Sequence, residues 1–256
     1  MILFVFEGKR REPDIFKTLD YLFFSEGQSI ISCFGNNIYE LYRQLSELGE
    51  AGDIVSLLRY LNRDNPDSPF SKDITTSDFA EIYLFFDYDF QNKNLPLETM
   101  NAQIAEMLDL FSDETENGKL YINYPMLEAI RYTKTLPDEL YVNYTVTRLD
   151  CRERRFKDMA QRFSAYGSLD FIVLDFRSTP EADRVAKAKN NWELLRIQNV
   201  VKANYLCNSL LCVPASKESI SQNKIFGAQL EKHILPHDEV AVLSAFPLFC
   251  FDYFKS

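Results

Sequence analysis

Short apolar runs that alternate with segments of helical periodicity constrain the fold of this chain more than any other feature of its sequence. Residues 2–6, 29–34 and 80–86 are short and largely apolar, which is typical of parallel strands buried on both faces. Between the second and third runs, residues 38–48 carry apolar side chains at the spacing of one helix face. The alternation predicts an α/β fold, with a mostly parallel sheet flanked by helices.

The remaining segments extend this order. The first helix is expected to begin near Pro13, because proline is favoured in a first helical turn. Further helices are predicted over residues 54–61, 95–111 and 125–132, a polar loop over 62–76, and a fourth short strand over 120–123. Residues 1–134 are therefore interpreted as one α/β domain.

Residues 135–256 are predicted to form a mainly helical C-terminal region that packs on the first domain. Helices are expected over residues 149–163, 181–211 and 216–233, residues 169–174 are either a strand or a buried helical turn, and the apolar tail 240–253 is expected to dock on the core.

Charge and cysteine content limit the classes of function. The net charge of −10 disfavours a protein that coats nucleic acid, although basic residues gathered on one face would still permit binding. The five cysteines are dispersed and odd in number, as in reduced cytosolic proteins. No stretch approaches the roughly 20 apolar residues that span a bilayer. We therefore expect a cytoplasmic protein with no membrane partner.

Three acidic residues follow two of the predicted strands. Glu7 comes after the first strand, and Asp87 and Asp89 come after the third. Functional groups gather at the carboxyl ends of parallel strands, and Mg²⁺ or Mn²⁺ prefers hard oxygen ligands. Each acid alone has a simpler explanation, because acidic residues commonly end strands and form turns. Their ordered combination favours a divalent-metal site.

The same residues resemble the Toprim fold over about residues 1–130. An apolar strand ending in Glu7-Gly8 and a later strand ending in Asp87-Tyr88-Asp89 are similar to its two motifs. The family includes topoisomerases, bacterial primases, OLD-family nucleases and small RNA-maturation nucleases. The resemblance implies that Asp87 and Asp89 bind Mg²⁺ or Mn²⁺, and that Glu7 completes the metal site or acts in acid/base catalysis.

A closer resemblance is to small Toprim-like proteins of bacterial phage-defence loci, of the RloB and abortive-infection type. It rests on Glu12 after Glu7-Gly8 and on Asn123, Pro125 and Glu128 in the stretch NYPMLE. The stretch departs from the pattern by an inserted tyrosine. The resemblance implies that Glu128 is a further metal ligand, with an ordinary helix-face acid as the alternative. It also implies a separate ATPase or sensor partner, and the chain itself lacks a P-loop motif.

Basic residues supply candidates for substrate binding. Lys9, Arg10 and Arg11 directly follow Glu7, and Arg154 and Arg155 belong to a basic cluster on a predicted helix. Their positive charges suit nucleic-acid phosphates. A solvated loop and a charged solvent face are the alternatives.

These observations predict a divalent-metal-dependent nuclease that acts on DNA or RNA. The two histidines, His233 and His237, lie together near the C-terminus and form no recognisable triad or zinc motif. The alternative is a non-catalytic Toprim-like regulatory or protein-interaction module, which the acidic charge and the many aromatic residues would suit. The two hypotheses differ in whether the three carboxylates meet.

Overall fold

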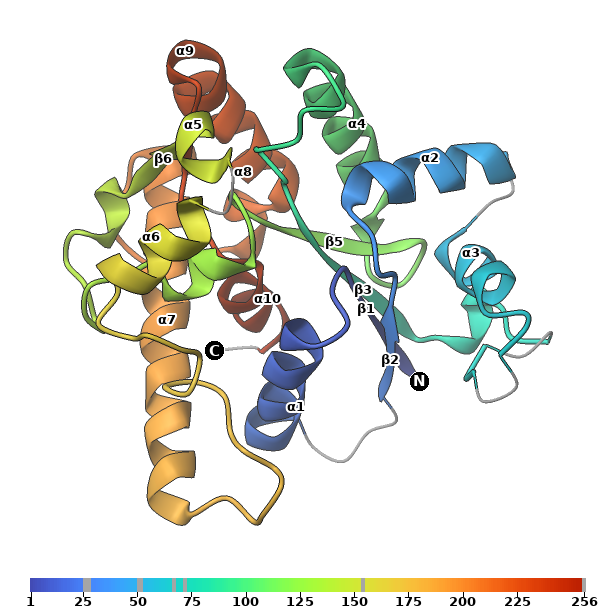
Figure 1. The fold of residues 1–256 in the computed structure, drawn as a ribbon, viewed down its shortest axis with the longest axis horizontal. Coiled ribbons are helices and arrows are strands. Elements are labelled where there is room, and N and C mark those ends of the chain that lie inside the picture. The colour runs from blue at the N-terminus through green and yellow to red at the C-terminus, as the bar shows by residue number, and fades with distance from the viewer. Residues whose placement is uncertain (25–28, 50–52, 66–67, 71–72, 153–154, 255–256) are drawn as a thin grey trace.

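A five-stranded sheet forms the centre of the molecule (Figure 1). The computed structural model describes residues 1–24, 29–49, 53–65, 68–70, 73–152 and 155–254. The strand order is β2-β1-β3-β5-β4, with β1 parallel to β2 and β3, β3 parallel to β5, and β4 antiparallel to β5. The strands are β1 (Ile2–Phe6), β2 (Ser29–Cys33), β3 (Glu81–Asp87), β4 (Ser112–Asp113) and β5 (Gly118–Asn123). The predicted α/β class with a mostly parallel sheet is confirmed.

Helices cover both faces of this sheet. In the N-terminal half they are α1 (Arg11–Phe23), α2 (Ile38–Leu48), α3 (Ile54–Leu61) and α4 (Leu97–Leu110). Figure 1 shows α1 on one side of the sheet and α2, α3 and α4 on the other. The chain passes from β1 to β2 on one side and returns to β3 on the other side of β1. The strand order therefore reverses between β1 and β3, which are direct neighbours.

Aromatic side chains of alternate strand residues fill the face of the sheet that α1 covers. The ring of Phe4 lies 4.0 Å from that of Phe16 in α1, and Phe85 stacks on Phe246 at 4.6 Å. Phe246 belongs to α10 (Ala245–Tyr253), so the end of the chain completes the core beneath the sheet. The expectation that residues 240–253 dock on the core is confirmed. One continuous hydrophobic cluster contains residues of both halves, and the boundary near residue 134 stays a prediction.

The C-terminal region is mainly helical, as expected. Its elements are η3 (Tyr141–Asn143), β6 (Thr145–Thr147), α5 (Arg148–Cys151), α6 (Arg155–Phe163), α7 (Ala182–Asn208), η5 (Lys217–Ile220), α8 (Gln222–Gln229), the π-helical η6 (Leu230–Ile234), α9 (Leu235–His237), β7 (Glu239–Ala241) and α10. Strands β6 and β7 form a small antiparallel sheet. Two short 3₁₀ helices, η1 (Thr76–Asp78) and η2 (Leu127–Arg131), complete the N-terminal half.

Several boundaries differ from the sequence expectation. Helix α7 ends before residue 211 because Ser209 adopts a left-handed backbone with φ 60°. The helix predicted over 216–233 is divided into η5, α8 and η6, and the one predicted over 125–132 is the shorter 3₁₀ helix η2. Residues 169–174 contain a turn and no strand. The two-residue strand β4 and the β6–β7 pair have no counterpart among the predicted elements, because they are too short to show periodicity.

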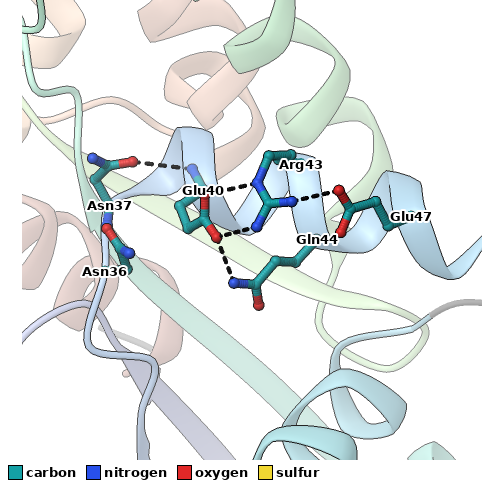
Figure 2. Close-up of polar contacts among 6 residues, drawn as sticks. All are labelled: Asn36, Asn37, Glu40, Arg43, Gln44 and Glu47. Carbon is teal, nitrogen blue, oxygen red and sulfur yellow. Dashed lines mark hydrogen bonds and ion pairs between the residues drawn. The ribbon is translucent and has the colours of Figure 1, made fainter. Parts of the chain in front are cut away.

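Side-chain contacts along α2 show how one of the covering helices is fixed (Figure 2). The Asn37 side chain accepts a hydrogen bond from the Glu40 amide at 3.0 Å, which caps the helix. Arg43 lies between Glu40, at 2.5 Å, and Glu47. Because these pairs are exposed to solvent, which screens their charges, they contribute little to stability. The main contribution to packing comes from the buried side of the helix, which includes Leu41.

Among the residues that the structure describes, no helix combines the length and the apolar character needed to cross a membrane.

Candidate functional site

Glu7 and Asp87 lie side by side at the carboxyl edge of the sheet. Glu7 directly follows β1, and Asp87 is the last residue of the neighbouring strand β3. The Glu7 carboxylate Oε2 accepts a hydrogen bond from the Asp87 backbone N–H at 3.0 Å. This edge is where the strand order reverses, and open α/β sheets bind ligands at such a point. The structure thus brings together two acids that are 80 residues apart in sequence.

Asn123 holds the Asp87 side chain from the next strand. It ends β5 in register with Asp87 and donates from Nδ2 to the Asp87 carboxylate Oδ1 at 3.1 Å. The side-chain amide oxygen Oδ1 of Asn123 accepts a hydrogen bond from the backbone N–H of Ala245 at 2.8 Å, where α10 begins. Asn123 is 1% exposed, so it fixes Asp87 against the C-terminal helix as well as against the sheet.

The Asp89 side chain is held differently from that of Asp87, although only one residue separates the two. Its backbone is left-handed, with φ 54°, a conformation that aspartate tolerates better than most residues. Its carboxylate accepts a hydrogen bond from Gln91 Nε2 at 2.6 Å. Asp89 is close enough to raise the pKa of Glu7 by charge repulsion, but it is not among the residues that line the cavity described next.

An open cavity of about 420 Å³ lies above Glu7 and Asp87. Its walls are formed by Glu7, Gly8, Lys9, Arg10, Arg11, Glu12, Asp87, Leu127, Glu128 and Lys157. The Glu12 carboxylate accepts the Gly8 N–H at 3.0 Å. A Cβ atom at Gly8 would lie 2.5 Å from Glu12 Oε2, so a larger residue there would force the Glu12 carboxylate to move. The turn after β1 is thereby drawn toward the start of α1.

Four carboxyl groups of this site have raised pKa values. Burial, followed by the charge of Asp89, raises the pKa of Glu7 to about 8. Burial, followed by the charge of Glu7, raises the pKa of Asp87 well above its ordinary value. The pKa values of Asp89 and Glu12 are also raised, chiefly by burial. At neutral pH the cluster therefore needs protons or a bound cation to reduce the repulsion among its members.

The donor chemistry of the site fits Mg²⁺ or Mn²⁺, because the cavity presents carboxylate oxygens and one of them is unsatisfied. Glu128 Oε2 is buried and has no hydrogen-bond partner among the described residues. In the conformation that the structure describes, however, no three Asp, Glu, His or Cys side chains of the described residues are already arranged around one metal position. The carboxylates of Glu7 and Glu12 are engaged with backbone N–H groups instead. Metal binding would require these side chains to turn toward a shared ion.

The predicted basic residues divide into two groups. Lys9, Arg10 and Arg11 line the cavity beside the acids. Arg155 is exposed at the first turn of α6 and is not among the cavity-lining residues. Arg154 lies outside the residues that the structure describes. The substrate-binding role of all five stays a prediction.

Two further side chains belong to this site. Asn123 was singled out from the sequence only as part of the stretch NYPMLE, and its contact with Asp87 was not expected. Lys157 belongs to the basic cluster that was predicted on a helix; it lies in α6, and the packing of α6 on η2 brings it to the cavity wall. Its Nζ lies 3.6 Å from Glu128 Oε1.

No family model, curated protein or solved structure matches this chain. The Toprim resemblance therefore rests on the sequence motifs alone. The observations that bear on function are the positions and contacts of the residues in this site.

Proposed function

We propose that this chain is a divalent-metal-dependent nuclease of the Toprim-like type, which hydrolyses phosphodiester bonds in DNA or RNA. The observation that carries the proposal is the adjacency of Glu7 and Asp87 at the point where the strand order of the sheet reverses. A cluster of buried carboxyl groups with raised pKa values in a cavity is typical of functional sites.

Asp87 and Asp89, completed by Glu7, are the residues that would hold Mg²⁺ or Mn²⁺, and Glu128 is the predicted further ligand. A bound divalent ion supplies charge stabilisation at the phosphoryl oxygens and an acidified water. Without metal, burial and the charge of Asp89 raise the pKa of Glu7 to about 8, and a bound cation would lower it. Glu7 would therefore act either as a metal ligand or as the general acid/base for the attacking water or the leaving oxygen.

The residues beside the acids attract and orient the substrate. Lys9, Arg10 and Arg11 line the same cavity, so their charges offset the repulsion between the carboxylates and a phosphodiester. Asn123 keeps the Asp87 side chain in place through its hydrogen bond.

The setting of this activity is also a proposal. All five cysteines are described and are free thiols, which suits the reducing cytosol. We propose a cytoplasmic enzyme of a phage-defence system, on the strength of the sequence resemblance. A separate ATPase or sensor protein would then control it, since a free nuclease would damage the cell's own nucleic acid.

A second candidate function is a non-catalytic Toprim-like module that regulates or binds another protein. The observation in its favour is that the acids of the described residues are not arranged around a common metal position. In that case the carboxyl groups would stay protonated or hydrogen-bonded, and the cavity would serve protein contact.

Calorimetric titration with Mn²⁺ and with Mg²⁺, combined with cleavage assays on mixed-sequence DNA and RNA, tests the proposal. We expect the wild type to bind metal and to cleave, and Asp87→Asn to lose both. Glu116→Gln is the matched control, because Glu116 is an exposed acid in the turn between β4 and β5. Absence of metal binding by the wild type would refute the nuclease and favour the second candidate. Metal binding without cleavage would point to a required partner.

A further inference from the structure

A buried glutamate in the cavity wall holds two cationic side chains that come from different parts of the chain. Glu128 lies on η2 and its side chain is 3% exposed. Its Oε1 accepts a hydrogen bond from Arg11 Nη1 at 2.9 Å and lies 3.6 Å from Lys157 Nζ. Arg11 begins α1 and Lys157 belongs to α6. The two cations are therefore brought to one side of the cavity by a single carboxylate oxygen.

Both cations retain donors that can reach a ligand. The side chains of Arg11 and Lys157 are 60% and 51% exposed. A guanidinium has five N–H donors and an ammonium has three, and Glu128 engages only part of each set. Both residues line the cavity together with Glu7 and Asp87. The remaining donors are thus available next to the proposed catalytic acids.

The helix that carries Lys157 is held by η2 through a second contact. Arg131, also on η2 and 6% exposed, donates to the backbone carbonyl of Lys157 at 3.4 Å and to that of Gly167 at 2.9 Å. The backbone of Lys157 is therefore held relative to η2, and its ammonium group lies at ion-pair distance from Glu128. This arrangement places Arg11 and Lys157 on the same side of the cavity before any ligand binds.

Stability alone does not explain this arrangement. An exposed ion pair contributes about 0–1 kcal/mol, whereas burying a carboxylate costs several kcal/mol unless its oxygens are satisfied. Glu128 is buried, its partners are exposed, and its Oε2 has no hydrogen-bond partner among the described residues. Such an energetic cost is expected where two cations must be positioned for an anion before it binds.

We propose that Arg11 and Lys157 form a phosphate clamp that binds a backbone phosphate next to the one that is cleaved, with Glu128 as its positioning residue. This inference rests on the proposed nuclease function. A phosphate is the anion that suits the pair, because an arginine fork and a lysine point charge bind its several oxygens together. The substrate is therefore a polynucleotide chain rather than a single nucleotide, and α6 of the C-terminal region takes part in holding it.

The clamp is tested by binding without metal, so that cleavage does not interfere. The probes are fluorescein-labelled 20-nucleotide DNA and RNA of mixed sequence, each single-stranded and as a duplex, titrated in EDTA between 50 and 200 mM KCl with fluorescence anisotropy as the readout. We expect Arg11→Ala and Lys157→Ala each to weaken binding roughly five- to twentyfold. Each should also lower the salt dependence of log Kd by about one phosphate contact.

Arg63→Ala is the charge-matched control. The Arg63 side chain is 55% exposed, close to the value for Arg11, and it follows α3, which lies across the sheet from α6 (Figure 1). We expect its affinity and salt dependence to equal those of the wild type. If Arg11→Ala and Lys157→Ala resemble this control while the wild type binds a probe, the clamp is refuted. Loss of metal-dependent cleavage in Asp87→Asn would still support the nuclease in that case.

The positioning role of Glu128 has its own test. Glu128→Gln keeps the size of the side chain and removes the charge that holds the two cations. In the Glu128→Gln background we expect Arg11→Ala to weaken binding less than twofold, because the guanidinium is no longer fixed. An undiminished effect of Arg11→Ala in that background would overturn the positioning role. A wild type that binds none of the probes would overturn the clamp, and metal binding would then decide the nuclease proposal separately.

Discussion

Replacing Glu7 with glutamine is expected to remove a pH dependence from the stability of the metal-free protein. The pKa of Glu7 is raised to about 8 in the folded chain, from an ordinary value of 4.5. Between these two values the folded state holds a proton that the unfolded state has released. Stability is therefore greatest below about pH 4.5, falls as the pH rises, and reaches its lower level above pH 8.

The size of this effect follows from the shift. One pKa unit corresponds to about 1.4 kcal/mol, which sets an upper limit of about 5 kcal/mol for Glu7. We expect a loss of about 2 to 3.5 kcal/mol between pH 5 and pH 8, because water in the open cavity reaches the partly exposed carboxyl group and relieves part of the penalty. In Glu7→Gln the side chain at this position does not titrate, and its oxygen can still accept the Asp87 N–H bond. The stability of this variant should therefore change less over this range, by the part that the raised pKa values of Asp87, Asp89 and Glu12 still contribute.

Urea unfolding in EDTA at pH 5, 6, 7 and 8 measures the difference. Trp192 is the single tryptophan and is 1% exposed, so its fluorescence reports loss of the core. Glu116→Gln serves as the control for removal of an exposed acid. Parallel pH profiles for the wild type and Glu7→Gln would refute the assignment of Glu7 as a protonated group. A bound divalent cation should raise stability at pH 8 more in the wild type than in Glu7→Gln, which keeps Asp87 and Asp89 but lacks the third carboxylate.

Three further substitutions test the construction of the site and the core. Gly8→Ala should destabilise the fold by about 1–3 kcal/mol, and less in a Glu12→Ala background, since the added methyl would otherwise lie 2.5 Å from the Glu12 carboxylate; thermal melts of the four variants give the coupling. Asn123→Ala should cost about 1–3 kcal/mol by urea unfolding, because it leaves buried polar groups unpaired, and it should also weaken Mn²⁺ binding through Asp87. Phe249→Ala should lower the free energy of unfolding by about 3–5 kcal/mol and leave the dependence of that free energy on pH unchanged. A loss below about 1 kcal/mol would contradict the inclusion of α10 in the core under the sheet.

Much of the N-terminal architecture is determined locally. The helices over residues 38–48 and 54–61 agree with α2 and α3 at both ends, because their apolar spacing and their Asn37 and Asp53 caps act within one or two turns. Strands β1 and β3 could be predicted equally well, because continuous apolar runs of that length are typical of strands buried on both faces. When parallel strands lie side by side, the residues at their carboxyl ends gather at one edge of the sheet. Glu7 and Asp87 were therefore expected to lie together.

The C-terminal half shows where local reasoning ends. The segment after Ser216 has helical composition, but its helix is divided into η5, α8 and a π-helical turn. Strands β6 and β7 are three residues each and pair across more than 90 residues of chain. Packing against elements that are distant in sequence decides such features. The spacing of apolar residues within a short segment therefore cannot predict them.

The order of the longer strands and helices in the N-terminal half, the mostly parallel sheet and the edge on which the acids lie could be read from the sequence alone, since each depends on hydrophobic spacing within a few residues. The contacts of those acids depend on the tertiary structure. The hydrogen bond from Asn123 to Asp87 and the meeting of Arg11 and Lys157 at Glu128 both require separate elements to pack together. The hydrogen-bond and ion-pair partners of a buried carboxylate are the groups that the fold brings within about 4 Å of it. Those distances cannot be read from the linear sequence.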